Sequence, residues 1–433
     1  MTQSRPPLSK SSKGKHAFRE KVESANQTAI CAATCERVGR RTLRELLRAN
    51  AYSFPIFQRR YCWTTDQWGT LWNDARKRTA LRHSLRRLTC TAVRSEQQRS
   101  MIIDGQQRMT TVTLILAATR DELVNNLGVQ RDDPLVASIH RMLFLDVEAM
   151  QEWVVQTSDA ADALREGTVL EFCRLIPSYC DRSAYLASIL PPWSRQAQTF
   201  RDTHYNPKWH RPFLAKAYFS QKLQSLIHES SSSLSPNNAQ SIIERFSRNL
   251  LDGIDMLYFP IATLDQSNDG TTDTQVIYER LAIRDATWCK PRRVSEYHVM
   301  DGSDMIRNLF LGSFSNTHEQ TDFYETYWLP LERLHPRTDD TTSCKEEESL
   351  KDVLSAFLMH EVSKLDEKQN TLIPTAISTA VIGGSLYRDF EAWMTYDYHH
   401  LSTTTKATPE AHTRDVGRKL LEFASVLLVR SLI

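Results

Sequence analysis

Residues 101–116, MIIDGQQRMTTVTLIL, carry the side chains in this chain that are best suited to chemistry. A short apolar strand is predicted to end at Asp104, Gly105 permits a tight turn, and a helix is predicted to follow. A helix N-terminus presents free N–H groups and a positive dipole end, so it can hold a phosphate. Arg108 would grip phosphate oxygens, and Asp104 would bind a divalent cation or orient an attacking water.

The two glutamines of this stretch, Gln106 and Gln107, supply neutral donors and acceptors for a base edge or a water molecule. A purely structural interpretation stands beside this one. In it, Asp104 caps the helix and Arg108 lies on the exposed helix face. The residues alone support the two interpretations equally.

A second stretch, residues 52–63 (YSFPIFQRRYCW), places two guanidinium groups between aromatic rings. Cationic groups that pair with phosphate, together with aromatic rings that stack on bases, are typical of nucleotide or single-strand binding. The side chains concerned are Gln58, Arg59, Arg60, Tyr61 and Trp63. The alternative is an aromatic core strand with two solvated arginines, and the residues of this stretch alone favour it.

Together the two stretches resemble the N-terminal domain of the GmrSD-type restriction endonucleases, within the wider ParB/sulfiredoxin-like superfamily. The family's Ile-Pro-x-Tyr-Gln-Arg-x-Tyr-x-Trp element is matched here by Phe54, Pro55, Phe57, Gln58, Arg59, Tyr61 and Trp63. Its Ile-Asp-Gly-Gln-Gln-Arg-Leu-Thr-Thr-Leu element is matched by residues 103–112. A weaker likeness to later family helices covers residues 277–281 (IYERL) and 304–310 (DMIRNLF). Since both long motifs occur in order, they are expected to lie side by side around one anion.

The resemblance implies binding and hydrolysis of a nucleoside triphosphate with Mg²⁺, in a protein of the restriction or DNA-processing type. The catalytic residues it implies are Asp104, Gln107 and Arg108, with Asp104 also as a Mg²⁺ ligand. The nucleotide-binding residues it implies are Gln58, Arg59, Arg60, Tyr61, Trp63, Gly105, Gln106, Thr110 and Thr111. Two alternatives stay open: a module that binds nucleotide or nucleic acid without turnover, and a degenerate structural relic.

The expected partners are a nucleotide, DNA and a separate nuclease subunit, because no HNH-type nuclease domain is recognisable in this sequence. No apolar run approaches the roughly 18 residues of a membrane span. No membrane partner is therefore expected. The eight cysteines are spread irregularly and are interpreted as reduced, buried thiols. The expected location is intracellular, either cytoplasmic or nuclear.

The hydrophobic pattern predicts an α+β fold, with a mixed N-terminal domain followed by a mainly α-helical domain, and the resemblance implies that the N-terminal domain is ParB/sulfiredoxin-like. The predicted divisions are a basic disordered tail at 1–35, the motif-bearing domain at 36–126 and the helical region at 127–433. Predicted helices cover residues 37–49, 65–77, 106–126, 349–364 and 420–432, and predicted strands cover 88–93 and 100–103. Residues 51–63, which contain Pro55, are expected to form an edge strand or an extended loop.

Charge is distributed unevenly along the 433 residues. Residues 1–108 hold 22 Lys and Arg against 8 Asp and Glu, a balance of +14, and the remainder holds 32 against 44, or −12. Within the first part, residues 76–99 contain eight basic residues and one acidic residue. Burying unpaired charges is costly. This segment is therefore expected to form a surface that faces nucleic acid or solvent.

Overall fold

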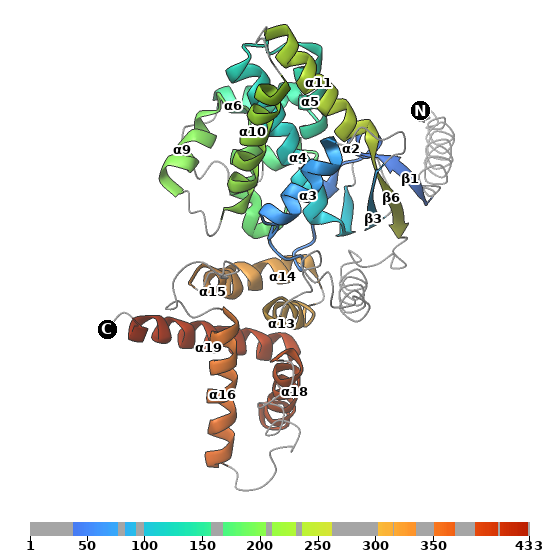
Figure 1. Ribbon diagram of the computed structural model, residues 1–433. Coiled ribbons are helices and arrows are strands. Elements are labelled where there is room, and N and C mark those ends of the chain that lie inside the picture. Colours follow the sequence, from blue (N-terminus) through green and yellow to red (C-terminus); the bar gives the residue numbers. More distant parts are fainter. Residues whose placement is uncertain are drawn as a thin grey trace, which may run out of the picture.

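A computed structural model gives the arrangement of the chain (Figure 1). It describes residues 38–76, 83–91, 99–156, 168–204, 210–230, 236–261, 302–314, 316–334, 350–368, 386–405 and 408–431. The predicted tail at 1–35 and the segment 277–281 lie outside these ranges. The fold is α+β with a mainly helical C-terminal part, as predicted.

A six-stranded mixed sheet has the strand order β1-β6-β3-β4-β2-β5. Its strands are β1 (Gly39–Thr42), β2 (Tyr52–Ser53), β3 (His83–Thr91), β4 (Ser100–Asp104), β5 (Leu175–Ile176) and β6 (Ile254–Ile261). In the middle of the sheet, β3 pairs antiparallel with β4 and parallel with β6. Residues 51–63, expected to form an edge strand or an extended loop, are mostly loop. Their only strand is β2, which is an inner strand because it pairs with both β4 and β5.

Helices pack on this sheet and extend beyond it (Figure 1). They are α2 (Leu43–Ala49), α3 (Thr65–Arg76), α4 (Gln106–Asp121), α5 (Pro134–Leu143), α6 (Val147–Gln156), α7 (Thr168–Phe172), α8 (Arg182–Ile189), α9 (Arg195–His204), α10 (Arg211–Ser230) and α11 (Pro236–Gly253). The π-helical turn η1 (Glu122–Asn126) continues α4, and the short 3₁₀ helix η3 (Tyr179–Asp181) precedes α8. The predicted helices at 65–77 and 106–126 are thereby confirmed.

The C-terminal part is entirely helical within the described residues. It comprises α13 (Gly302–Leu311), α14 (Thr317–Phe323), the π-helical η5 (Tyr324–Trp328), α15 (Leu329–Leu334), α16 (Leu350–Lys368), α18 (Leu386–Thr405) and α19 (Pro409–Ser431). The predicted helices at 349–364 and 420–432 fall within α16 and α19, apart from their outermost residues. No helix among the described residues combines the length and the apolarity needed to cross a membrane.

The first helix begins later than its predicted start at residue 37. Residues 39–42 form β1, and α2 begins at Leu43 because Thr42 and Glu45 form a capping box. The Thr42 hydroxyl accepts from the Glu45 N–H at 3.2 Å, and the Glu45 carboxylate accepts from the Thr42 N–H at 2.7 Å. These reciprocal bonds satisfy two backbone donors and fix the start of the helix.

One hydrophobic core joins the sheet to the helices on it, with buried residues that run from Leu43 to Tyr258. It includes residues on both sides of position 126, such as Leu114 on α4 and Phe219 on α10. The domain boundary at 126 stays a prediction, and a single core crosses it. A second core contains the C-terminal helices together with Phe57 and Ile103 from the sheet-containing part.

A cluster of buried charges ties α4 to the end of α8. Arg120 donates to the carbonyl of Ile189 at 2.7 Å, and Lys216 donates to that of Ser188 at 2.7 Å. Asp121 pairs with both cations, at 2.7 Å and 2.5 Å. Cations bound to the last carbonyls of a helix satisfy its unpaired acceptors. The cluster is therefore buried at a point where backbone groups need partners.

His140 on α5 is buried near this cluster, and its Nε2 atom has no hydrogen-bond partner among the described residues. Burial, assisted by repulsion from Arg120, lowers the pKa of His140 to about 4. The unfolded chain binds a proton at this residue near pH 6.5, whereas the folded chain does not. Stability therefore falls as the pH drops from about 6.5 toward 4.

We expect this residue to remove up to about 2 kcal/mol of unfolding free energy between pH 7 and pH 5. Urea unfolding at both pH values measures the difference for the parent, His140→Leu and His228→Leu. His140→Leu should lack this part of the loss, whereas His228→Leu, on the exposed side of α10, should retain it. An equal pH effect in all three proteins contradicts the assignment.

Candidate functional site

The first motif-bearing turn passes from β4 into α4 through a single glycine. Gly105 has a φ of +112°, and a Cβ atom there would lie 2.8 Å from Cδ1 of Leu88. Both the left-handed backbone and the close approach exclude a larger residue. The turn places Asp104, the last residue of β4, directly before the first turn of α4.

The Asp104 carboxylate lies between two guanidinium groups. Its Oδ1 accepts from Nη2 of Arg108 at 3.0 Å, and its Oδ2 lies 3.8 Å from Nε of Arg87. The three side chains are 33%, 16% and 38% exposed in that order, so a ligand can reach them. Two cations around one carboxylate leave the group positively charged, and it favours an anion.

The structural interpretation of these two residues is wrong in both of its parts. Gly105, not Asp104, is the N-cap of α4, and no side chain caps this helix end. The Arg108 side chain is only 16% exposed, and its Nη1 donates to the carbonyl of Leu85 at 2.5 Å. This bond and the Asp104 pair together hold the plane of the guanidinium group in one orientation.

Strand β3 is irregular where it meets this group. Its pairing with β6 shifts register between Ser84 and Arg87, and Arg86 within the shift has a φ of +70°. Such bulges bend a strand and redirect its side chains and carbonyls. The irregular residues supply both the Leu85 carbonyl and the Arg87 guanidinium. The sequence indicated only a basic surface here, so Arg87 is a site residue that it did not identify.

The second motif, residues 52–63, lies against the first through buried hydrogen bonds. Gln58 Nε2 donates to the carbonyls of Ile102 and Ile103, at 3.3 Å and 2.8 Å. The Tyr61 hydroxyl lies 2.7 Å from the Thr111 hydroxyl. The expectation that the two motifs lie side by side is confirmed.

Gln107 connects its own motif to the backbone of residues 52–63. Its Oε1 accepts from the N–H of Cys62 at 2.9 Å, and its Nε2 donates to the carbonyl of Arg60 at 3.0 Å. The amide thus satisfies two backbone groups of a segment that has no regular secondary structure. Gln107 therefore supports the shape of the site from inside, with its amide already engaged.

The other predicted nucleotide-binding residues differ in accessibility. Gln106, Thr110 and Arg60 are buried, and Arg59 and Trp63 are partly buried. Tyr61 is buried as well, and its hydroxyl also accepts from Nε1 of Trp68 at 2.7 Å. Burial raises the pKa of the Tyr61 hydroxyl well above its usual value. Arg59 and Trp63 are therefore the predicted nucleotide-binding residues of this group that remain partly accessible, as Asp104 does.

Asp181 is a further residue at this site that sequence reasoning missed. Its carboxylate accepts from the Tyr61 N–H at 2.5 Å and from the Ser178 hydroxyl at 2.5 Å. Burial raises the pKa of Asp181, although the Ser178 hydrogen bond and the charge of Arg60 oppose that shift. Because 120 residues separate Asp181 from Tyr61, no local pattern could have revealed the contact.

The basic segment 76–99 is only partly the surface that its composition predicts. Arg76 and Arg86 are exposed, and residues 77–82 and 92–98 lie outside the described residues. Arg99 is different, because it donates to the carbonyls of Leu170, Glu171 and Cys173 around the end of α7. Burial lowers the pKa of the Arg99 guanidinium. Arg99 therefore acts as an internal cap on helix carbonyls.

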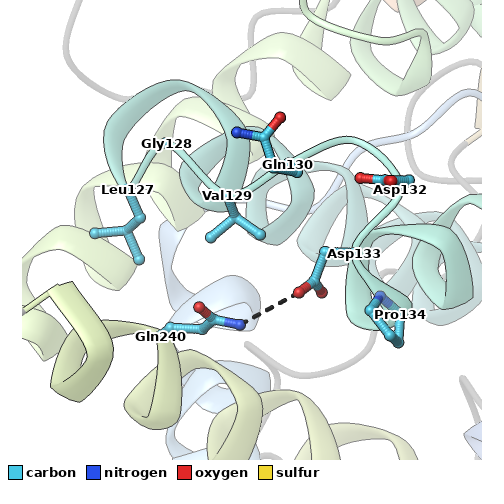
Figure 2. Close-up of a pocket in the computed structure, with 8 residues that line it drawn as sticks. All are labelled: Leu127, Gly128, Val129, Gln130, Asp132, Asp133, Pro134 and Gln240. Carbon is cyan, nitrogen blue, oxygen red and sulfur yellow. Dashed lines mark hydrogen bonds between the residues drawn. The ribbon is translucent and has the colours of Figure 1, made fainter.

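A pocket of about 480 Å³ lies elsewhere, between the loop before α5 and Gln240 of α11. Figure 2 shows Asp133 hydrogen-bonded to Gln240 across it, at 3.5 Å. None of the predicted site residues lines this pocket. It therefore adds no support to the site at Asp104.

A resident Mg²⁺ does not fit the donors around Asp104. This single carboxylate is already paired with Arg108 and lies near Arg87. Across the described ranges, no group of three or more His, Cys, Asp or Glu side chains gathers that could hold a metal ion. The arrangement favours an anion over a cation.

The sequence model of one protein family, described as "GmrSD restriction endonuclease, N-terminal domain", matches residues 43–285. The match covers more than half of the chain and includes both motifs, Arg87 and Asp181. No curated protein matches this chain.

Gly105→Ala is expected to destabilise the fold by about 1–3 kcal/mol, because Ala meets both a left-handed backbone and Leu88. Gly128→Ala is a matched control, since Gly128 has a φ of +67° with no atom within 4 Å of the added Cβ. It should show the backbone cost alone, roughly 1 kcal/mol. Urea midpoints measure both variants, and equal losses would contradict the close contact at Gly105.

Proposed function

Because the chain belongs to the GmrSD restriction endonuclease N-terminal domain family, we propose that it binds and hydrolyses a nucleoside triphosphate. The family membership indicates a restriction-type, DNA-processing protein, and the proposal concerns the nucleotide chemistry within that class. One observation carries it: a partly exposed carboxylate, Asp104, lies between the guanidinium groups of Arg87 and Arg108.

The arginines fit the phosphates of such a substrate. A guanidinium group has five donors, and the hydrogen bonds described for Arg108 use one on each of its Nη atoms. The Arg87 side chain is 38% exposed beside the Asp104 carboxylate, so a ligand can reach its guanidinium group. Donors that the fold leaves unused can bind phosphate oxygens and stabilise the charge that develops during phosphoryl transfer.

Asp104 supplies the group that a binder of phosphate would not require. Beside a bound phosphate, its carboxylate can orient a water molecule for attack and accept the proton that the water loses. A carboxylate also repels phosphate, so it weakens binding of the nucleotide. Its presence at a phosphate site is therefore explained better by a role in turnover than by a role in binding. This favours the hydrolytic proposal over a module that only binds nucleotide.

The buried motif residues have a supporting role in this proposal. Gln58, Tyr61, Gln107 and Thr111 use their polar atoms to hold the two motifs together. Gln107, expected from the resemblance to be catalytic, is thus a positioning residue. Since the donors around Asp104 do not fit a resident metal ion, we propose that Mg²⁺ arrives as part of the nucleotide complex.

Two variants test the roles of the charged residues. Arg108→Ala should weaken nucleotide binding and turnover together, because it removes the phosphate donor. Asp104→Asn is nearly isosteric and removes a negative charge. It should keep nucleotide binding while hydrolysis falls by roughly 100-fold. Phosphate release and nucleotide-dependent shifts in melting temperature measure these effects with Mg²⁺ present.

Arg44→Ala and Asp252→Asn are the matched controls, since they break a similar partly exposed ion pair that has an N–O distance of 2.6 Å. Both should hydrolyse nucleotide like the parent. Undiminished hydrolysis in Asp104→Asn ends the catalytic assignment. A parent that binds nucleotide without turnover leaves the binding module, and a parent that does neither leaves the structural relic.

DNA and a separate nuclease subunit are the partners that we propose with this activity. Arg86 is exposed beside Arg87, and Arg76 is exposed at the end of α3, where it pairs with Glu229. Both belong to the basic segment and can contact DNA phosphates. Contacts to phosphate release counterions, so affinity depends steeply on salt.

Affinity for duplex DNA should fall steeply between low and physiological salt, and Arg76→Ala should lower the slope of log affinity against log salt by about 1. Arg414→Ala is a fair control, because Arg414 is also an exposed arginine in an ion pair. Filter binding over a range of salt concentrations measures both. A flat salt dependence in the parent leaves only a solvated basic face.

A further inference from the structure

Helix α13 carries four polar residues that are almost completely buried, Ser303, Asp304, Arg307 and Asn308. Arg307 lies 3.3 Å from the carboxylate of Asp304 and 3.5 Å from that of Glu332 on α15. Burying such a charge group costs free energy that an apolar group would not. A buried guanidinium with two acidic partners therefore needs an explanation other than core packing.

The acidic partner on α15 is itself fixed. Glu332 accepts from the Tyr324 hydroxyl at 2.8 Å and from Nε1 of Trp328 at 3.1 Å. These bonds come from η5, so the guanidinium of Arg307 is held in place by two neighbouring helical elements. Figure 1 shows α13, α14 and α15 on the side of the C-terminal helices that faces the sheet-containing part.

Arg307 reaches out of this cluster to the backbone of the second motif. Its Nη2 donates to the carbonyl of Phe57 at 2.8 Å. The amide of Asn308, oriented to satisfy its neighbours, donates to the same carbonyl at 3.0 Å. The Phe57 ring is fully buried in the core of the C-terminal helices. Phe57 is thus held by both its side chain and its carbonyl.

The next residue transmits this position to the site. Gln58 donates to the carbonyls of Ile102 and Ile103, the two residues before Asp104. The Ile103 side chain lies in the same C-terminal core as Phe57. The end of β4 is therefore held from the C-terminal helices by packing and by a chain of hydrogen bonds.

We propose that Arg307 is a positioning residue for the Asp104 site, and that the C-terminal helices set the geometry of that site through Phe57, Gln58 and Ile103. Its effect on turnover rests on the proposed function, whereas its effect on the position of β4 does not. A planar guanidinium suits this role because it can pair with two carboxylates and donate to a carbonyl at once.

Arg307→Lys tests the proposal, since lysine keeps the charge and loses the planar set of donors. Tyr324→Phe is the matched control, because it removes a hydrogen bond from the same buried cluster. It leaves Trp328 bonded to the Glu332 oxygen that faces Arg307, and it leaves the bond from Arg307 to the Phe57 carbonyl in place. Amide hydrogen exchange of residues 100–112, followed without nucleotide, reports on the end of β4 and the start of α4. We expect exchange to speed up about tenfold or more in Arg307→Lys and less than about twofold in Tyr324→Phe.

Turnover is the second readout. In Arg307→Lys, kcat for phosphate release should fall at least about tenfold with little change in KM, since Arg87 and Arg108 remain. Tyr324→Phe should keep the parent's kcat. If the parent shows no turnover, the proposed function fails while the exchange measurement still decides the positioning role.

Gln58→Met breaks the same path from the other side, with both bonds to the end of β4 lost and little change in side-chain volume. It should reproduce the exchange pattern of Arg307→Lys, and it replaces that variant should Arg307→Lys fail to fold. Unchanged exchange in residues 100–112 in Gln58→Met and in a folded Arg307→Lys overturns the proposal. An equal acceleration in Tyr324→Phe does so as well, because it indicates general loosening of the cluster.

Discussion

The hydrogen bonds of Gln107 to the backbone of the second motif are the constraint on which the site depends. Residues 54–63 have no regular secondary structure in which to pair their N–H and carbonyl groups. A buried backbone group without a partner costs about 1–3 kcal/mol. One glutamine amide satisfies the N–H of Cys62 and the carbonyl of Arg60, and Gln58 works in the opposite direction, toward β4. The irregular segment is thus held in place by side-chain hydrogen bonds instead of strand pairing.

Two residues next to this supported segment, Gly105 and Arg86, have an uncommon backbone conformation. Gly105, in the left-handed region, joins β4 to α4. Arg86, which also has a positive φ, lies in the neighbouring strand β3. Backbone of this kind persists only where the surrounding structure over-determines it. Here the irregular backbone brings the Leu85 carbonyl to Arg108, and it brings the guanidinium groups of Arg87 and Arg108 to Asp104. The irregular backbone therefore holds the charges of Asp104, Arg87 and Arg108 close together where the site is partly exposed.

The sequence predicted the parts of this arrangement that local pattern or family resemblance encodes. The helical spacing around Trp68 and Leu71 predicted α3, and the two motifs predicted their own contact. The start of α2 was missed because residues 39–42 pair with β6 and the Thr42–Glu45 capping box fixes the helix start at Leu43. Contacts of Asp181 and Arg99 with residues more than 70 positions away leave no local signal, so composition alone assigned Arg99 to the surface.

The structural and the chemical interpretations of the motifs do not exclude each other, because different residues of the same motif carry them. Phe57 and Gln58 are neighbours, yet Phe57 packs in the C-terminal core and Gln58 bonds to β4. Buried glutamines and aromatic rings would be needed for the fold even in a protein without activity. The partly exposed ion pairs of Asp104 with Arg87 and Arg108 contribute little to folding, since exposed and half-exposed ion pairs stabilise a fold by only about 0–1 kcal/mol. The charges of Asp104, Arg87 and Arg108 are therefore the part of the site on which the proposed function rests.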